Sequence, residues 1–358
     1  MIYLHYDKKH YLLVDPLINI MKKASVLARG FFATSRGKTA HGLIRHGKKY
    51  RIVEVVDETL EGRDAGEVMG DGYRGIPIVA DFSKDADTLI IGVAPPGGRL
   101  PKEWRKDIVN AIKNRMNIVS GLHDFLSDDP EFSQLAKRHG VKIWDVRKPP
   151  KNLSIAKGFK SEKTVILVLG TDSSVGKRTA ALELVKSAEK KGFNAGFVAT
   201  GQTGMMIGAD AGVAVDAVQS DFVSGAVEKM VMDVSKNREI VFVEGQGAIS
   251  HPAYGSVALG ILYGSKPDYV IMVHDPARKN SGSFSGKIPK LEDEIKLIEK
   301  LGKTKVVGLA LNCGNVKNWG KKVKEYEEKT GLPTVDVLKE NADRLLKGIT
   351  NHIKREKR

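Results

Sequence analysis

The chain has 358 residues, enough for two domains with substantial cores, and a formal net charge of +15. Its single cysteine, Cys313, excludes an internal disulfide bond and favours a reducing compartment. No segment resembles a signal peptide. The apolar patch from Tyr11 to Met21, interrupted by Asp15 and Pro16, is too short to span a bilayer. We therefore expect a cytoplasmic protein that has no membrane partner.

The basic residues are spread along the whole chain, without a basic stripe interleaved with aromatic residues. Nucleic acid is therefore not the expected partner. A basic surface also attracts phosphorylated or carboxylated small molecules. Lysine-rich segments with interspersed glutamate, such as Lys321 to Lys329, are typical of solvated helix faces and of ion-pair networks in thermophile proteins. We expect a small-molecule substrate, an amino acid being the first candidate, and a homo-oligomer.

The first part of the chain alternates short apolar runs with helical patterns, which predicts a Rossmann-like parallel sheet. The expected strands are 24–30, 51–56, 76–80, 88–93, 117–120 and 141–146, and the expected helices are 38–46, 102–115 and 130–139. A strict GxGxxG motif is missing, so we predict no dinucleotide site here. Pro149 and Pro150 then break the pattern and precede a polar stretch. We predict a Rossmann-like domain over 1–150, a linker over 151–162 and a second domain over 163–358.

The second part of the chain repeats the α/β alternation, and its first loop makes it a P-loop nucleotide-hydrolase-type domain. Its expected strands are 165–169, 194–200, 240–244, 269–273, 306–311 and 334–337. Its expected helices are 179–191, 217–234, 291–301 and 319–330, with a basic helix at the end of the chain. The predicted fold class is thus α/β, with two parallel sheets in succession.

The stretch from Lys163 to Ala181 organises this second domain. It consists of an apolar strand, a small-polar loop that ends in a Gly-Lys pair, and a helical pattern from Thr179 onward. Backbone N–H groups of such a loop and of the helix N-terminus point at an anion, and the lysine adds a mobile positive charge. We predict a phosphate-binding loop formed by Gly170, Thr171, Asp172, Ser173, Ser174, Gly176, Lys177, Arg178 and Thr179.

The loop departs from the usual pattern of glycine, four residues and Gly-Lys-Ser/Thr. Thr171 occupies the position of the first glycine, Arg178 occupies the Ser/Thr position, and Thr179 supplies a hydroxyl one residue late. The alternative interpretation is a helix N-terminus that binds nothing. A Gly-Lys pair at a strand-to-helix turn favours a phosphate-bearing ligand, because the lysine charge needs a partner.

Three further loops follow strands of the second sheet and should meet the phosphate loop at one edge. They are Gly201-Gln202-Thr203-Gly204, the run from Glu244 to Gly255, and His274-Asp275-Pro276-Ala277-Arg278. Arg278 is suited to a carboxylate or a phosphate. From these loops we expect the substrate-binding residues Gln202, Thr203, Tyr254 and Arg278.

Two residues of these loops are candidates for catalysis. Glu244 ends a buried strand, where an acidic residue holds magnesium or its water, or acts as a base. Thr179 and Glu244 are thus the candidate Mg²⁺ ligands, with a carboxylate that caps the next turn as the alternative for Glu244. His251 lies in a polar loop and is a candidate acid or base, or else a hydrogen-bonded structural histidine. We interpret His274 as structural and Cys313 as an inert buried thiol.

GTDSSVGKRT resembles the phosphate loop of dethiobiotin synthetase, an ATP-dependent ligase with the pattern Gly-Thr-Asp-Thr-x-Val-Gly-Lys-Thr. Glu244-Gly245 after the IVFV strand resembles the acidic strand end of that enzyme. In that enzyme a magnesium-binding threonine stands where this chain has Arg178, so Thr179 would have to substitute for it.

Nine blocks over residues 24–345 resemble a two-domain family formerly of unknown function, which includes bacterial D-glutamate N-acetyltransferases. The blocks are GKTAHGLIR, GIPIV, GVAPPGG, GLHDFLSDDPEF, DVRKPP, GTDSSVGKRTAALEL, TGQTGMMIG, VDAVQSDFVSGAVE and VEGQGAISHPAYGSVALGILYGSKPD. The resemblance implies that acetyl-CoA is the cofactor and that the loop binds one of its phosphates. His251 or Glu244 would then be the base that deprotonates the amino group, and Arg178 a second cation for the anion.

Two other functions stay open. One is an ATP- and Mg²⁺-dependent ligase of the dethiobiotin synthetase type, and the other is a non-catalytic nucleotide- or CoA-binding protein. The acceptor substrate, its chirality and the ligand of the first domain do not follow from the sequence.

Overall fold

The computed structural model describes residues 21–83, 85–281 and 286–356. The patch Tyr11 to Met21 therefore lies, apart from its last residue, outside the described residues. No helix in the described ranges is both long enough and apolar enough to cross a membrane. The contacts within the chain define two compact units. The N-terminal unit contains the described residues up to Lys148 together with Met205–Gly208, and the C-terminal unit contains the remainder from Pro149.

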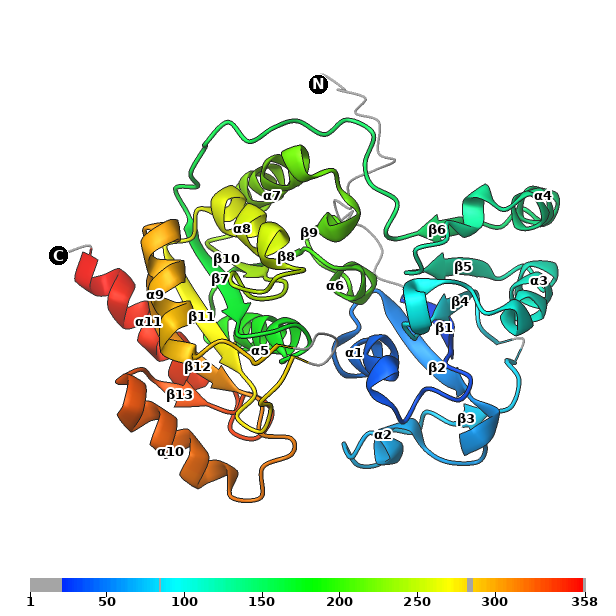
Figure 1. Cartoon of the computed structure of the whole chain (residues 1–358). Helices are drawn as coiled ribbons and strands as arrows, with labels where there is room; N and C mark the ends of the chain where they lie inside the picture. The colour runs from blue at the N-terminus through cyan, green and yellow to red at the C-terminus, as the bar shows by residue number, and fades with distance from the viewer. Residues whose placement is uncertain (1–20, 84, 282–285, 357–358) are drawn as a thin grey trace. The chain divides into compact units, whose positions relative to one another are not determined.

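The N-terminal unit is built on a six-stranded parallel sheet with the strand order β3-β2-β1-β4-β5-β6 (Figure 1). This arrangement confirms the predicted Rossmann-like parallel sheet. Its strands are β1 (Lys22–Leu27), β2 (Tyr50–Val56), β3 (Ile78–Val79), β4 (Thr88–Ile91), β5 (Asn117–Ser120) and β6 (Ile143–Asp145). Its helices are α1 (Lys38–His46), α2 (Ala65–Val68), α3 (Arg105–Lys113) and α4 (Pro130–His139).

Helices α1 and α4 have the predicted bounds, whereas two other predictions need correction. Strand β1 ends at Leu27 rather than at Gly30. Gly30 turns the chain with φ of +70°, and its N–H donates to the Asp57 carboxylate at 2.9 Å. The expected helix over 102–115 begins as a single 3₁₀ turn, Lys102–Trp104, and becomes α-helical only from Arg105.

The C-terminal unit is built on a seven-stranded parallel sheet with the order β13-β12-β11-β7-β10-β8-β9. Its strands are β7 (Thr164–Gly170), β8 (Ala195–Ala199), β9 (Ala211–Gly212), β10 (Ile240–Glu244), β11 (Tyr269–His274), β12 (Lys305–Leu311) and β13 (Thr334–Val335). Its helices are α5 (Lys177–Lys190), α6 (Gln202–Ile207), α7 (Ser220–Ser235), α8 (Gly255–Ser265), α9 (Leu291–Gly302), α10 (Trp319–Thr330) and α11 (Asp343–Glu356). The last residues of α6 are grouped with the N-terminal unit.

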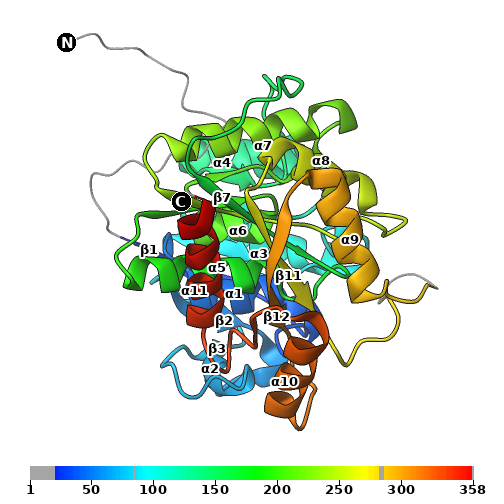
Figure 2. The same cartoon turned by 90° about the vertical axis from the view of Figure 1, so that its left-hand side faces the viewer.

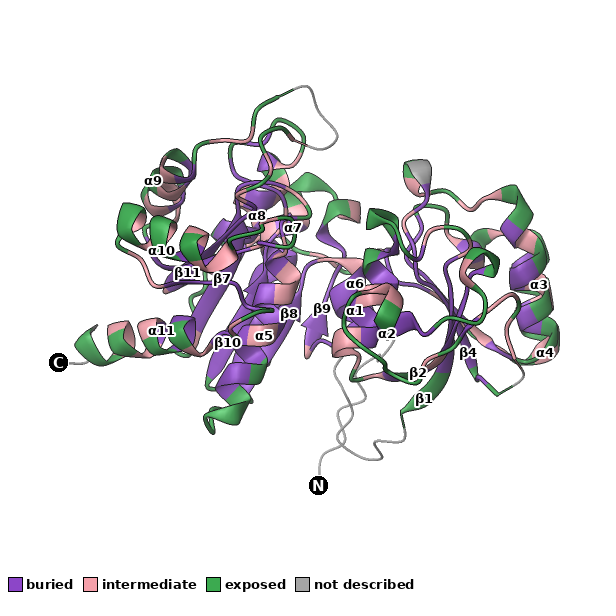
Figure 3. Cartoon of the chain, turned by 90° about the horizontal axis from the view of Figure 1, so that it is seen from below, coloured by how far each residue is buried: buried purple, intermediate pink, exposed green. Residues whose placement is uncertain are grey.

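Helices cover both faces of the second sheet. Helices α5 and α11 lie on one face, and α7, α8 and α9 lie on the other (Figures 1 and 2). Every residue of β7 from Val165 to Gly170 is buried, because its side chains point alternately to the two covered faces. Figure 3 shows the same pattern throughout, with buried strands inside and exposed helix surfaces outside. A continuous apolar run is thus the expected signature of such a strand.

The sequence did not predict α6, α8 or the short strand β9. Helix α8 is apolar around most of its circumference and contains glycines, so it carries no amphipathic stripe. Those glycines let it approach α7 closely, since a Cβ on Gly264 would collide with the Ser224 carbonyl oxygen. Close packing between two helices, and not local periodicity, therefore determines this element.

Candidate functional site

The phosphate loop lies between the central strand β7 and helix α5. Gly176 immediately precedes the helix and has φ of +110°, a left-handed conformation that favours glycine. The helix then starts at Lys177, whose buried ammonium group donates to the Asp172 carbonyl oxygen at 2.5 Å. The first-turn N–H groups of this 14-residue helix and the lysine charge lie at the same loop. An anion is the ligand that such a loop favours.

Glu244 lies beside this loop because strands β10 and β7 are parallel neighbours, with Glu244 in register with Val168. Its side chain is buried, and burial raises the pKa of the carboxyl group. The charges of Arg178 and Lys177 and the Gly201 N–H oppose this rise. Glu244 is thus a buried carboxylate that combines a raised pKa with two nearby cations of the loop.

The turn that leads into helix α6 lies against Glu244. The Gly201 N–H donates to Oε2 of Glu244 at 3.3 Å, and the Thr200 hydroxyl donates to its backbone oxygen at 2.7 Å. A Cβ on Gly204 would lie 2.8 Å from Oε2, so the absence of a side chain there makes room for the carboxylate. Gln202 and Thr203, predicted to bind substrate, directly follow Gly201 at this edge.

Asp172 is the second buried carboxylate of the site, with 1% of its residue surface exposed. The Ser173 N–H donates to Oδ1 at 2.7 Å, and the Ser281 hydroxyl donates to the same oxygen at 3.3 Å. Arg278 donates to Oδ2 at 3.3 Å and to the Ser173 carbonyl oxygen at 2.7 Å. Its guanidinium group also reaches the Ser174 carbonyl oxygen at 3.4 Å. Arg278, predicted to bind substrate, therefore binds the phosphate loop itself.

The hydrogen bonds of His251 define its tautomer. Its Nδ1 accepts the backbone N–H groups of Ala253 at 3.1 Å and Tyr254 at 3.2 Å. The neutral ring therefore carries its proton on Nε2, which lies 3.2 Å from Oγ of Ser281 and 3.5 Å from Oδ1 of Asp172. The Tyr254 ring stacks on the imidazole at a centroid distance of 4.7 Å. Tyr254, predicted to bind substrate, thus supports the histidine.

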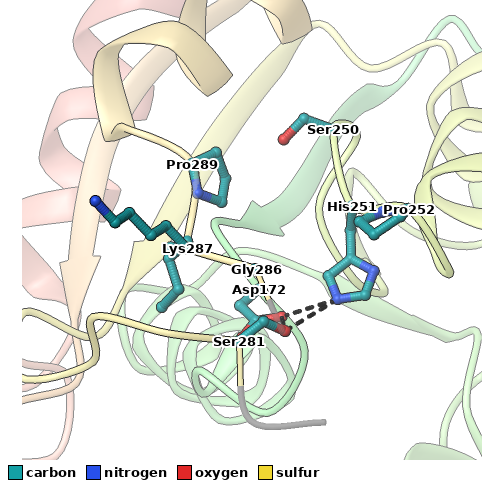
Figure 4. Close-up of a pocket in the computed structure, with 9 residues that line it drawn as sticks. Asp172, Ser250, His251, Pro252, Ser281, Gly286, Lys287 and Pro289 are labelled. Atoms are coloured by element: carbon teal, nitrogen blue, oxygen red, sulfur yellow. Dashed lines mark hydrogen bonds and ion pairs between the residues drawn. The ribbon is translucent and has the colours of Figure 1, made fainter. Parts of the chain in front are cut away.

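A pocket of about 210 Å³ opens beside Asp172 and His251 (Figure 4). In this view the imidazole of His251 points toward Asp172 and Ser281, and Lys287 and Pro289 form the opposite side. The lining residues are Asp172, Ser250, His251, Pro252, Ser281, Gly286, Lys287, Ile288 and Pro289. The pocket thus joins the phosphate loop to the turn before α8 and to the strand-to-helix connection before α9.

Glu294, in the first turn of α9, anchors the turn that carries His251. It is completely buried and accepts the N–H of Ile249 through a short hydrogen bond. It also accepts the Ser250 hydroxyl at 2.6 Å and the Ser250 N–H at 3.3 Å. Nothing in the sequence marks this glutamate, because it lies in an ordinary acidic first helical turn.

His274 contacts the phosphate loop at Thr171 and helix α10 at Tyr326. Its Nδ1 lies 2.9 Å from Oγ1 of Thr171, and its Nε2 lies 3.1 Å from the Tyr326 hydroxyl on α10. Burial lowers the pKa of His274 to about 4, so the ring is neutral at physiological pH. Burial likewise raises the pKa of the Cys313 thiol to about 11, which makes it a poor nucleophile.

The candidate metal ligands are Thr179, half-buried in the first turn of α5, and the buried Glu244. Among the residues that the structure describes, no group of three or more His, Cys, Asp or Glu side chains is placed to hold a metal ion. Magnesium held by one hydroxyl and one carboxylate would need water and ligand phosphate oxygens for its remaining positions. The Mg²⁺ site stays a prediction that belongs to the ATP alternative.

Comparison with known proteins identifies the family of this chain. Residues 152–346 match the P-loop domain of DUF1611, and residues 58–149 match its N-terminal Rossmann-like domain. The chain belongs to the DUF1611 family. A solved structure of a DUF1611 protein from Anabaena variabilis has 35% sequence identity and a TM-score of 0.86, and the match covers 92% of this chain and 99% of that one. The predicted succession of Rossmann-like and P-loop domains is confirmed.

Two curated relatives are named D-glutamate N-acetyltransferase. The one from Pseudoalteromonas is 37% identical over 269 residues, which are 73% of this chain and 80% of the relative. The one from Tritonibacter scottomollicae is 36% identical over 272 residues, with the same coverage. These relatives confirm both the family resemblance seen in the sequence and the predicted class of enzyme, an acyltransferase with a P-loop fold.

Proposed function

We propose that this DUF1611 protein transfers the acetyl group of acetyl-CoA to the amino group of a D-amino acid such as D-glutamate. The observation that carries the proposal is Glu244, a buried carboxylate of raised pKa beside the lysine of a phosphate loop. A base of raised pKa suits the deprotonation of an ammonium group, and a phosphate loop suits a donor that carries phosphates. The names of the two curated relatives supply the reaction and the acceptor.

The residues of the loop fit a CoA phosphate. Lys177 and Arg178 supply two cations next to the N-terminus of α5, and acetyl transfer needs no phosphoryl chemistry at that position. The replacement of the magnesium-binding hydroxyl by Arg178 is therefore compatible with this reaction. We propose that the loop from Gly170 to Thr179 holds a phosphate of the donor and so positions its thioester.

In the proposed reaction Glu244 accepts a proton from the ammonium group of the acceptor. The freed amine nitrogen attacks the thioester carbonyl carbon and forms the new C–N bond. The C–S bond then breaks, and the CoA thiolate leaves and is protonated while the amide nitrogen loses its second proton. Backbone N–H groups of the glycine-containing loops are the donors we propose for the oxyanion. Gln202 and Thr203 remain our candidates for contacts with the substrate.

The tautomer of His251 favours Glu244 as the base and direct attack as the route. Nδ1 of His251 accepts two backbone N–H groups, so Nε2 holds a proton and cannot take one from Ser281. A serine nucleophile activated by this histidine would require the opposite arrangement. We therefore propose that no acyl-serine forms at Ser281. In this tautomer neither ring nitrogen is available to take a proton, so His251 has a positioning role in this mechanism.

Calorimetric titration tests the role of the loop. We expect wild-type protein to bind acetyl-CoA, Lys177→Ala to lose most of this affinity, and Lys190→Ala to keep it. Lys190 is the matched control because it is exposed at the far end of the same helix. Tight binding of ATP with Mg²⁺ without binding of acetyl-CoA would refute the proposal and favour the ligase. Binding of CoA without turnover of any acceptor would favour a non-catalytic role.

Mass spectrometry of the product tests the chemistry. We expect N-acetyl-D-glutamate from D-glutamate and acetyl-CoA, with one free thiol released for each amide formed. Glu244→Gln should lower kcat by about 10²- to 10⁴-fold, the usual contribution of a general base. Full acetyl transfer by both Glu244→Gln and His251→Ala would show that the proposed roles are wrong.

A further inference from the structure

We propose that the pocket between His251 and Lys287 is the subsite for the amino-acid acceptor. In this subsite the buried Asp172 binds the ammonium group, and Lys287 binds a carboxylate. The inference rests on the proposed acetyl transfer for the identity of the ligand. Glu244 does not line this pocket, so a proton that leaves the ammonium group here reaches that base through solvent. The subsite gives Asp172 a function that differs from phosphate binding.

The size of the pocket argues against the donor as its occupant. Its volume is about 210 Å³. Pockets for drug-sized ligands have volumes of roughly 300–1,000 Å³, so this one suits a small metabolite better than a nucleotide or CoA. Among its lining residues, all of which the structure describes, Asp172 alone comes from the phosphate loop. A small ligand in the pocket would therefore border the donor site without filling it.

The polar groups of the pocket suit a zwitterion. Asp172 presents a carboxylate that is almost completely buried. Its Oδ1 is contacted by Ser173, Ser281 and, at 3.5 Å, His251. Its Oδ2 is contacted by Arg278, which leaves one acceptor position on that oxygen. An ammonium group can donate to the remaining position. The exposed Lys287 starts from the wall opposite His251, and in Figure 4 its ammonium group extends away from the imidazole. Its long exposed side chain therefore has to turn inward to bind a carboxylate in the pocket. A ligand with an ammonium group at one end and a carboxylate at the other would match both.

Two features fix the direction in which the ligand lies. Asp172 belongs to the phosphate loop, so an ammonium group bound there lies at the donor side of the pocket. Nε2–H of His251 lies 3.2 Å from the Ser281 oxygen, and the Ser281 hydroxyl in turn donates to the Asp172 carboxylate. Lys287 belongs to the segment that leads into α9, so the carboxylate lies away from the loop. This orientation brings the reacting nitrogen, and not the carboxylate, to the donor.

The test is the binding of D-glutamate and of glutarate, which lacks the ammonium group, to wild-type protein and to Lys287→Gln. The control is Lys290→Gln, an exposed lysine in the same segment that does not line the pocket. We expect wild type to bind D-glutamate more tightly than glutarate. Lys287→Gln should weaken D-glutamate about fivefold, the upper range for an exposed ion pair, and leave acetyl-CoA unchanged. Lys290→Gln should change neither.

Several results would overturn the subsite. These are equal affinity for glutarate and D-glutamate, no effect of Lys287→Gln on D-glutamate, or a loss of acetyl-CoA affinity in that variant. No binding of D-glutamate to wild type that still binds acetyl-CoA would also overturn it. A Lys287-dependent affinity for D-glutamate without any N-acetyl product would support the subsite and refute the proposed acetyl transfer.

Discussion

The contact between α9 and the His251 turn leads to a prediction with a calculable size. Glu294→Gln keeps the shape of the side chain but removes its charge. The carboxylate makes two close hydrogen bonds, one with the Ile249 N–H and one with the Ser250 hydroxyl at 2.6 Å. A hydrogen bond to a charged group contributes about 1.5–3 kcal/mol, against roughly 0.5–1.5 kcal/mol for a neutral one. The two bonds together should therefore contribute about 2 kcal/mol less to the free energy of unfolding in the variant.

For a unit of about 200 residues this loss corresponds to a decrease in Tm of roughly 4–8 °C, which thermal unfolding followed by circular dichroism can measure. Because Ser250 and His251 line the acceptor pocket, KM for D-glutamate should also rise while acetyl-CoA affinity stays constant. Asp293→Asn is the control, an exposed acid in the same helical turn. A Tm equal to that of the control would refute the stabilisation. An unchanged KM at lowered Tm would refute the positioning role.

Three further predictions concern two supports of the site and one contact of the linker. Arg278→Lys should weaken acetyl-CoA binding by about tenfold in calorimetry, because a compact ammonium group does not reproduce the planar guanidinium group, whose two terminal nitrogens reach three separate loop oxygens; equal affinity would contradict this. His274 has a folded-state pKa of about 4 against 6.5 when unfolded. As the pH is lowered from 6.5 to 4, the unfolded state takes up the proton first, so the unfolding free energy should fall by up to about 3 kcal/mol. The fall should be smaller in His274→Asn. Glu228→Gln should speed proteolysis near the linker, since Glu228 accepts the N–H groups of residues 157–159.

Much of the fold could be predicted from the sequence because both sheets are parallel and covered on both faces. Strands such as β10 and β7 are continuous apolar runs. Helix α5 was expected from Thr179 and starts two residues earlier, at Lys177. Glu244 could be chosen from its position at a strand end alone. Helix α8 could not be predicted, since close packing against α7 replaces the usual amphipathic pattern.

The parts of the site that the sequence missed depend on contacts between distant residues. Arg278 was expected to bind substrate because it is a cation after a strand, but which anion it pairs with is decided only in three dimensions. Ser281 and Lys287 lie in a connection without a strand or helix pattern, so nothing in the sequence marked them as neighbours of Asp172. Local patterns identify residues at a sheet edge, whereas long-range packing selects their partners.

The electrostatics of Glu244 link donor binding to the state of the base. Burial raises its pKa, and the positive charges of Arg178 and Lys177 lower it. A phosphate bound to those two cations would offset their effect, so the pKa of Glu244 should rise further when the donor binds. By linkage, donor affinity should then fall as the pH rises through the pKa of Glu244 in the free protein. The base would thus become stronger only when the donor is present.

This coupling can be measured as proton uptake. Acetyl-CoA should be titrated into the protein at one pH in two buffers of different ionisation enthalpy, near the acid limb of the rate profile. We expect binding to take up a fraction of a proton in wild type, and Glu244→Gln to bind without that uptake. Lys177→Ala should reduce both affinity and uptake, because it removes one of the offset charges. Equal uptake in wild type and Glu244→Gln would assign the proton to another group and refute the coupling.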